Sequence, residues 1–193
     1  MKQLLSFILL AICLNIFAHF PVIVDSDKST GLISDVTFAP VQVGVGFFEK
    51  WQLYDGSAHS FVSAGVLGIM QKSALISFAP VNMLKKNYFL QCGIPACATE
   101  ENYFLSFALL NATHKNCGLQ LGVGNISTSD WGTQIGFVNL GPQIQIGAYN
   151  IDGKVQIGLL NGHGKVQIGL LNYNRNSYIL WLPFINWDMG RKK

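Results

Sequence analysis

The residues that could do chemistry in this chain of 193 amino acids are few and widely spaced. Four histidines stand far apart, at His19, His59, His114 and His163. None of them has the H-x-x-x-H or H-E-x-x-H spacing that places two zinc ligands on one helical face. His163 lies between glycines, where we expect a turn, and an isolated turn histidine is more often solvated than metal-bound. The sequence therefore predicts no metal site.

Catalytic patterns are equally weak. We expect the adjacent acids Glu100 and Glu101 in an exposed loop rather than as a general acid–base pair. The stretch 158–165 has the glycines and lysine of a phosphate-binding loop, but the spacing differs and Val166 replaces the Ser or Thr. No G-x-S-x-G nucleophile elbow is present. We predict a non-enzymatic protein with no catalytic residue, no cofactor and no evident small-molecule substrate.

The cysteines leave two possibilities open. Cys92 and Cys97 could close a small disulfide loop in an exported protein, which would leave Cys117 unpaired. The alternative is three free thiols. No paired C-x-x-C spacing indicates a zinc site.

The composition narrows the class of protein. Half of the residues are hydrophobic and 12% are charged, about half of the usual share of roughly 25%. Much of the surface is therefore expected to face lipid, a partner or neighbouring repeats. The small net charge of +3 is scattered, whereas nucleic-acid binding needs a clustered basic face.

The N-terminus has the features of a secretory signal peptide. Lys2 precedes an uncharged apolar run over 4–16, and Ala18 is a small residue at a cleavage position. A membrane anchor is the alternative, although the run is short for a span of about 20 residues. We predict a signal peptide over 1–18, a lead-in over 19–34, one β-repeat domain over 35–187 and a charged tail over 188–193.

A seven-residue phrase is repeated through the second half of the chain. VQIGLLN occurs at 155–161 and again at 166–172, and weaker copies begin at residues 119, 133 and 144. The last four copies have a period of 11 residues, whereas 14 residues separate the copies at 119 and 133. A fixed period with insertions is typical of a repeat architecture.

Each phrase alternates with period two, which indicates a strand. Val155, Ile157, Leu159 and Asn161 are expected on one face, and the residues between them on the other. Asp152-Gly153 is a hairpin signal. We therefore predict an all-β fold, an antiparallel meander of short repeats forming a curved sheet, sandwich or barrel. The alternative is a parallel β-solenoid, in which glycine stacks on glycine and the asparagines form a ladder.

The sequence is consistent with two environments for the apolar face that the repeats share. It could pack on N-terminal strands around 35–48, 59–71 and 73–84. It could instead contact lipid in a small outer-membrane β-barrel that anchors or conducts, with an interfacial aromatic girdle formed by Tyr173, Tyr178, Trp181, Phe184 and Trp187.

The repeat phrases resemble those of the leptospiral-type bacterial surface repeat proteins, whose signature is a run of G-L-Q-I-G-L-[IV]-N. Asn172-Tyr-Asn174 followed by LPFIN at 182–186 resembles the segment that closes such runs, and VTFAPVQ at 36–42 is also similar. The resemblance covers about 36–187. Several copies here begin with Lys or Pro-Gln in place of Gly-Leu.

The resemblance implies export to the cell surface or outer membrane, and no reaction. We therefore predict an exported, surface- or outer-membrane-associated repeat protein with a structural or adhesive role. Its expected partner is the outer membrane or a surface protein, and not nucleic acid.

Overall fold

The structure is a computed structural model that describes residues 38–45, 59–128 and 131–190. Within these residues it consists of strands and turns, without helix, so the expected all-β class is confirmed. The expected signal peptide (1–18) and lead-in (19–34) lie outside the described residues. The strands are β1 (Phe38–Gly44), β2 (His59–Gly65), β3 (Gly68–Phe78), β4 (Val81–Asn102), β5 (Leu105–Asn116), β6 (Leu119–Ser127), β7 (Thr133–Leu140), β8 (Ile144–Ile151), β9 (Val155–Gly162), β10 (Val166–Tyr173) and β11 (Trp181–Trp187).

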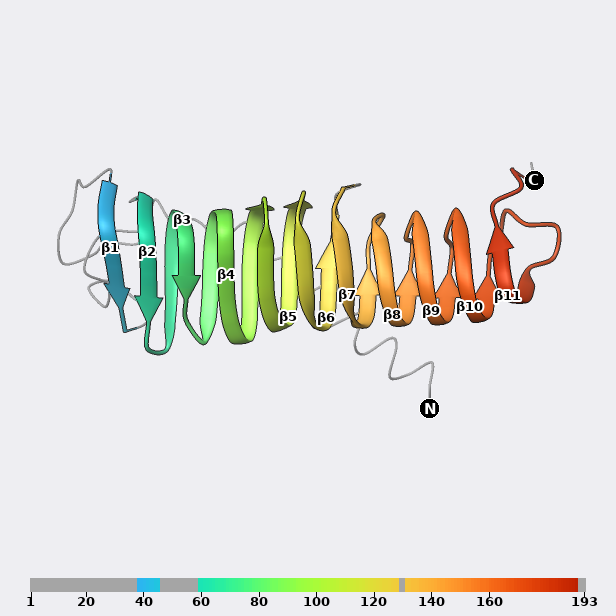
Figure 1. Cartoon of the computed structure of the whole chain (residues 1–193), viewed down its shortest axis with the longest axis horizontal. Coiled ribbons are helices and arrows are strands. Elements are labelled where there is room, and N and C mark those ends of the chain that lie inside the picture. Colours follow the sequence, from blue (N-terminus) through green and yellow to red (C-terminus); the bar gives the residue numbers. More distant parts are fainter. Residues whose placement is uncertain (1–37, 46–58, 129–130, 191–193) are drawn as a thin grey trace.

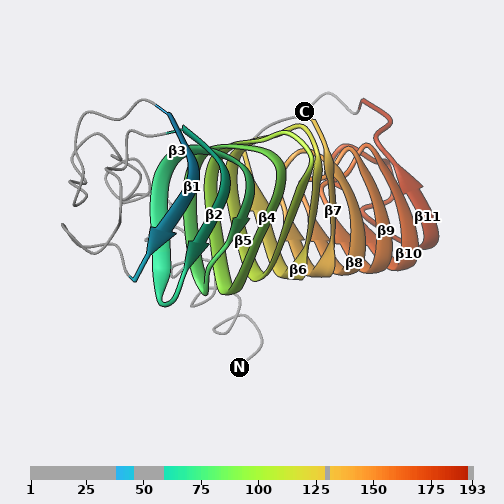
Figure 2. The same ribbon diagram turned by 60° about the vertical axis from the view of Figure 1, so that its left-hand side comes forward.

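The strands are stacked in chain order as a parallel β-solenoid (Figures 1 and 2). Every neighbouring pair from β1 to β10 is parallel, and β11 alone runs antiparallel to β10. Ile157 is paired with Ile168, and Gly158 with both Gly147 and Gly169. The expectation of an antiparallel meander is therefore wrong, and the alternative of a parallel solenoid is correct.

The turns explain why the hairpin signal misled. A type I′ hairpin needs positive φ at two successive residues. At the Asp152-Gly153 turn only Asp152 has one, at 62°, and His163 repeats it one coil later at 56°. The backbone of Asp152 also donates to Gly162 O at 2.9 Å, which lies in the next coil. One left-handed residue thus turns a corner, and inter-coil pairing continues through it.

Coil length changes along the axis. Leu105 pairs with Leu119, and Leu119 with Thr133, so these coils hold 14 residues. Thr133 pairs with Ile144 and Ile144 with Val155, so the following coils hold 11. The strands that carry the repeat phrase stay in register, and the missing three residues come from the segment that precedes each of those strands.

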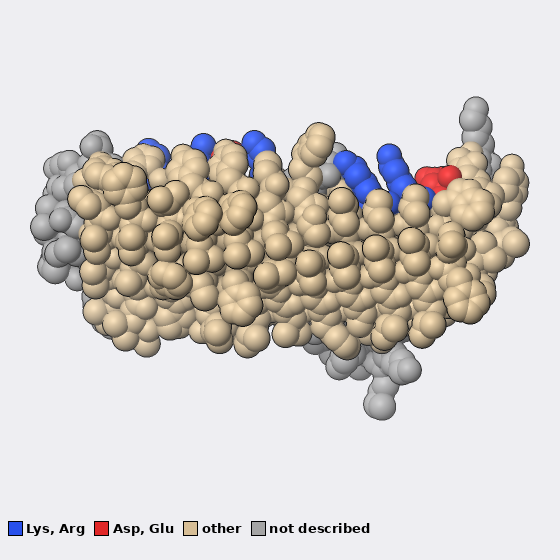
Figure 3. Space-filling view, in the orientation of Figure 1, with Lys and Arg blue, Asp and Glu red and all other residues tan. Residues whose placement is uncertain are grey.

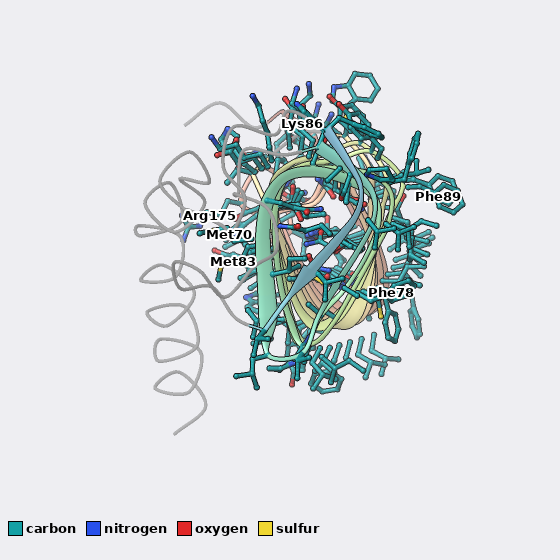
Figure 4. The ribbon with its side chains drawn as sticks, turned by 90° about the vertical axis from the view of Figure 1, so that its left-hand side faces the viewer. Met70, Phe78, Met83, Lys86, Phe89 and Arg175 are labelled. Carbon is teal, nitrogen blue, oxygen red and sulfur yellow. The ribbon has the colours of Figure 1, made fainter. Side chains whose placement is uncertain are left out.

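The interior of the solenoid is polar. Figure 4, a view along the axis, shows nitrogen and oxygen atoms inside the coils. One column consists of glutamines with fully buried side chains, joined by amide hydrogen bonds of 2.9 to 3.1 Å. A second consists of buried asparagines joined at 2.7 to 2.9 Å. The two columns are Gln120, Gln134, Gln145, Gln156 and Gln167, and Asn111, Asn125, Asn139, Asn150, Asn161 and Asn172.

The two ladders point in opposite directions along the axis. Gln156 donates back to Gln145 Oε1 in the preceding coil, whereas Asn161 donates forward to Asn172 Oδ1 in the following coil. The second amide hydrogen of each reaches a backbone carbonyl, Gly162 O at 3.1 Å and Ile168 O at 3.0 Å respectively. Because buried amides are costly unless paired, a polar interior is stable here only while the coils remain in register.

Inward-facing glycines set how closely the coils approach. A Cβ built on Gly158 would lie 2.0 Å from Gly147 O, and one on Gly169 would lie 2.0 Å from Gly158 O. Real Cβ atoms do not come this close to a backbone oxygen, so this column requires glycine.

The expected faces of the strand are partly wrong. Val155, Ile157 and Leu159 do point outward, but Asn161 is buried. The strand bends at Leu159 and Leu160, which are both exposed, and the alternation resumes with its phase shifted. This bend turns the asparagine into the interior.

The expected packing of the apolar face on the N-terminal strands is also wrong. The described parts of those segments are β1, β2, β3 and the start of β4, and they are coils of the same solenoid. Their large buried apolar side chains, Ile69 and Leu84, are few. Hydrophobic side chains lie mainly on the outside.

Candidate functional site: an apolar exterior with one charged edge

The outward rows of the solenoid are apolar on both flat faces. One row holds isoleucines that are 38% to 44% exposed. A second row is more exposed, with Leu159 at 53% and Leu170 at 63%. In Figure 4, Phe78 and Phe89 point away from one face, and Met70 and Met83 lie at the opposite one. The isoleucines are Ile135, Ile146, Ile157 and Ile168. Monomeric soluble proteins rarely expose contiguous apolar surface beyond a few hundred Å², so this exterior is the most unusual feature of the molecule.

Charged side chains gather along a single edge. Figure 3 shows the blue of basic residues and the red of acidic residues at one rim of the solenoid, and an uncharged surface across the rest of that view. The register brings many of them together, because Glu101 pairs with Lys115 in the next coil and Lys86 follows Lys85 at the position paired with Ser73, next to Lys72. We call this the charged edge. Its described members are Lys72, Lys85, Lys86, Glu100, Glu101, Lys115, Asp152, Lys154, Lys165 and Asp188. Arg175 lies next to this edge, on the flat face that carries Met70 and Met83 in Figure 4.

At the N-terminal part of the charged edge, ion pairs follow the stack. Glu101 lies 3.1 Å from Lys86 Nζ in one neighbouring coil and 3.9 Å from Lys115 Nζ in the other. A hydrogen bond from the Tyr103 hydroxyl at 2.6 Å, followed by these lysines, lowers the pKa of Glu101. All of these groups are solvent-accessible, so water and salt screen the pairs and each one stabilises the fold only weakly.

Aromatic rings flank the charged edge. Tyr88 stacks on Tyr103, with ring centroids 5.6 Å apart. Tyr88 comes two residues after Lys86 in the chain, and Tyr103 two residues after Glu101. Trp131 lies under the ammonium group of Lys154, at 5.5 Å from the ring centroid. The charge is therefore separated from the aliphatic rows by side chains that are apolar with a polar end.

The aromatic residues of the expected girdle lie at the C-terminal end. Trp181, Phe184 and Trp187 are on β11, Tyr178 precedes it, and Tyr173 ends β10. The first four are exposed, Tyr178 by 71% and Phe184 by 70%, whereas Tyr173 is half-buried. They form an end of the solenoid rather than a ring around it.

The other residues considered from the sequence are not brought together. His163 lies in a turn, 3.6 Å from Asp152 Oδ1 and edge-on to Tyr173. His59 hydrogen-bonds Ser73 Oγ at 2.6 Å in the next coil. In the described residues, no group of three or more His, Cys, Asp or Glu side chains could hold a metal ion. The stretch 158–165 runs through a strand and a turn into another strand, not into a helix.

The three described cysteines are free thiols. Cys97 is buried, and its Sγ donates to Phe107 O at 3.6 Å. Burial raises the pKa of this thiol far above its ordinary value. Cys117 is exposed and Cys92 is intermediate.

The signal for the polar interior was present in the repeats. Glutamine and asparagine occupy fixed positions in successive copies, whereas the apolar positions vary among Ile, Val, Leu, Phe, Tyr and Ala. An invariant polar position inside a repeat indicates a ladder, because each side chain must match the identical one above and below it.

Comparisons with known proteins found no relative of this chain. No family model, curated protein or solved structure matches it. Among the described residues, no helix has the length and apolar character needed to cross a membrane.

Proposed function

We propose that this chain is a non-enzymatic, exported scaffold that lies in one leaflet of a membrane. Its long axis would lie in the membrane plane, its apolar faces would contact acyl chains, and its charged edge would lie at the head groups. One observation carries the proposal. Apart from Arg175, the described charged residues gather along one edge, while large hydrophobic side chains are exposed on the rest of the solenoid.

The polar interior supports this arrangement. Backbone groups in hydrocarbon must be paired within the protein. In the solenoid, backbone N–H and C=O groups pair between coils, and the buried amides pair within the Gln and Asn ladders. An apolar shell around a largely hydrogen-bonded polar interior can contact lipid. The buried side-chain atoms that lack a hydrogen-bond partner are Gln71 Oε1, Asn87 Oδ1, Gln167 Oε1 and Ser177 Oγ in the described part of the chain.

The dimensions favour one leaflet rather than a span. The straight part of a short coil, 155–159, holds five residues, and a strand rises about 3.3 Å per residue, so it extends roughly 16 Å. This is about half of the hydrocarbon thickness of roughly 30 Å. The charged edge and the opposite apolar corner would therefore lie near the head groups and near the bilayer centre, respectively.

The aromatic residues support the same orientation. Tyrosine and tryptophan are enriched at the level of the lipid head groups. Tyr88, Tyr103 and Trp131 lie beside the charged edge, where this orientation requires such residues. The rows farther from the edge are apolar and contain aromatic as well as aliphatic residues, with Phe107 in the isoleucine row and Tyr149 in the row of Leu160.

Vesicle flotation tests the proposal. The full-length chain, purified in detergent and diluted into phosphatidylcholine vesicles, is expected to float with the lipid and keep a β-type circular dichroism spectrum. A triple variant, Ile146→Ser, Ile157→Ser and Ile168→Ser, removes part of one outward row. Each exposed isoleucine contributes about 1 kcal/mol of burial, so we expect binding about 100-fold weaker.

The matched control keeps the lipid-facing rows intact. Lys72→Ser, Lys85→Ser and Lys115→Ser change the same number of residues on the charged edge and should leave binding to neutral vesicles within about threefold of the original chain. A full-length chain that stays monodisperse without detergent and does not float would refute the proposal.

A further inference from the structure

A groove lies on the charged edge over the C-terminal coils. It has a volume of about 570 Å³, and Gly153 and Gly164, both buried, form its floor. Three cations and two carboxylates border it together with one histidine. They are Lys154, Lys165, Arg175, Asp152, Asp188 and His163. We call this the cationic groove.

The fold creates the cationic groove through the change in coil length. Coils after Thr133 are three residues shorter at this edge, so the rim is lower there. The connection between β10 and β11 closes the far end. Asn174 Nδ2 donates to Gly164 O at 2.7 Å, and Asn176 Nδ2 donates to Asp188 Oδ2 at 3.0 Å. These hydrogen bonds hold the end wall of the groove against its floor.

The cations come from different elements but face one space. Lys154 and Lys165 occupy equivalent positions in consecutive coils, because Val166 N donates to Lys154 O at 3.0 Å. Their backbones are therefore about 4.8 Å apart. Arg175 enters from the end wall, and its Nε donates to the Tyr173 hydroxyl at 3.3 Å. A planar guanidinium and two ammonium groups that line one groove are a suitable donor set for a phosphate group.

The two carboxylates already have partners in the protein. Asp188 accepts hydrogen bonds from Gly190 N at 2.8 Å and from Asn176. These bonds, with a further contribution from Lys165, lower the pKa of Asp188, so it is ionised at neutral pH. Asp152 lies beside His163 Nδ1. The cations outnumber the carboxylates, and the groove keeps an excess of positive charge.

From this geometry we infer that the cationic groove binds the phosphate of a lipid head group, with Lys154, Lys165 and Arg175 as its ligands. The inference rests on the proposed position of the charged edge at head-group level. There the groove would open toward phosphates held at high local concentration, while the apolar rows keep the solenoid in the leaflet. The protein would then prefer membranes that contain phosphate-bearing lipids with a net negative charge.

The test compares two lipid compositions and two triple variants of the full-length chain. Vesicles contain phosphatidylcholine alone, or phosphatidylcholine with one fifth phosphatidic acid. The groove variant carries Lys154→Gln, Lys165→Gln and Arg175→Gln. The control carries Lys72→Gln, Lys85→Gln and Lys115→Gln, which removes the same charge from the same edge outside the groove. Circular dichroism and thermal melting confirm that both variants fold.

The original chain should bind the acidic vesicles more tightly than the neutral ones. Each cation near a head group contributes about fivefold, so both variants should lose about 100-fold of this preference through charge alone. The groove variant should lose at least about tenfold more than the control, because it also removes the groups that donate directly to the phosphate. Equal losses in both variants, or no loss in the groove variant, would overturn the inference, because general attraction between charges would then account for the binding.

Two further outcomes separate the inference from the proposed function and from free phosphate. If the chain ignores neutral vesicles but binds acidic ones through the groove residues, the leaflet proposal fails and the groove inference stands. Calorimetric titration with inorganic phosphate and glycerophosphate gives the second outcome. Tight binding of inorganic phosphate, with no effect of lipid composition, would assign the groove to a soluble anion and overturn the lipid inference.

Discussion

Replacing Gly158 with alanine tests the stacked register most sharply. The new Cβ would lie 2.0 Å from Gly147 O, 2.5 Å from Asn150 Nδ2 and 3.1 Å from Gly147 C. The first and third atoms are backbone, so a rotamer change cannot relieve the contact, and the coils must separate or tilt. Overpacking in a core costs about 1–3 kcal/mol where side chains can adjust. We expect at least 3 kcal/mol here, because opening the coils also stretches the Asn and Gln ladders.

Gly162 provides a matched control in the same strand. A Cβ on Gly162 would meet Asn150 O at 3.9 Å, an ordinary contact. Its φ is not in the left-handed region, and Gly→Ala at such a position stabilises a protein by about 0.4–1 kcal/mol through the unfolded state.

Thermal and urea unfolding, followed by circular dichroism, measure the difference. Because repeat proteins can unfold in parts, the shift of the transition midpoint is the quantity to compare. We expect a fall of many degrees for Gly158→Ala and little change or a rise for Gly162→Ala. Equal effects of the two substitutions would refute the close approach of coils at Gly158.

The remaining predictions concern the inward and outward residues. Gln156→Leu should destabilise the fold by about 2–5 kcal/mol, since it leaves Gln145 Oε1 without its donor and Gln167 Nε2 without its acceptor in the ladder. Ile157→Gln, on the outside, should change stability by less than about 1 kcal/mol. If urea unfolding ranked the two substitutions the other way, the polar interior would be contradicted. Alkylation with iodoacetamide should modify Cys117 within minutes and Cys97 only after unfolding, because Cys97 is buried with a raised pKa; mass spectrometry that finds Cys97 modified first would count against the packing of β4. Burial, followed by the charges of Lys72 and Lys86, lowers the pKa of His59. The unfolded chain therefore binds a proton at His59 more readily than the folded chain does. The stabilisation from neutral His59 is complete above about pH 6.5 and is lost as the pH falls through the folded-state pKa. An NMR titration of His59 with a midpoint above 6.5 would show that this reasoning is wrong.

Much of the fold could be predicted from the sequence. The repeat phrase marks the strands well, because the copy at 133–139 corresponds to Thr133–Leu140 and the copy at 155–161 to Val155–Gly162. The period of 11 and the preceding step of 14 are the coil lengths of the structure. Alternation and period are local properties of a strand, so they are readable without knowing the neighbours.

The direction of neighbouring strands could not be predicted in the same way. Asp152 adopts positive φ in the solenoid, and it would also do so in a type I′ hairpin. Gly158 would lie opposite Gly147 and Gly169 in either arrangement. The local signals are therefore shared by both folds, and the choice depends on long-range pairing.

Assigning inside and outside failed for a different reason. Apolar residues usually lie inside, and by that rule one of the two positions predicted for the face of Ile157 was a core against the N-terminal strands. In the solenoid, the coil has room for one inward Gln, one inward Asn and glycine, and the ladders satisfy the amides. The cationic groove could not be foreseen either, since it depends on the loop after β10 folding back against Gly164.

Disulfide trapping of two cysteine pairs tests the central claim most directly. In a background where Cys92, Cys97 and Cys117 are replaced by serine or alanine, one variant carries Ile157→Cys with Ile168→Cys, and the other carries Leu159→Cys with Ile168→Cys. Paired positions on adjacent parallel strands lie about 4.8 Å apart, which is close enough for a disulfide. In the parallel stack Ile168 pairs with Ile157, so Leu159 is displaced by two residues along the strand and lies too far from Ile168 to form one. The solenoid predicts rapid cross-linking of the first pair and little of the second; efficient cross-linking of the second pair alone is the antiparallel result and would contradict the stacked coils.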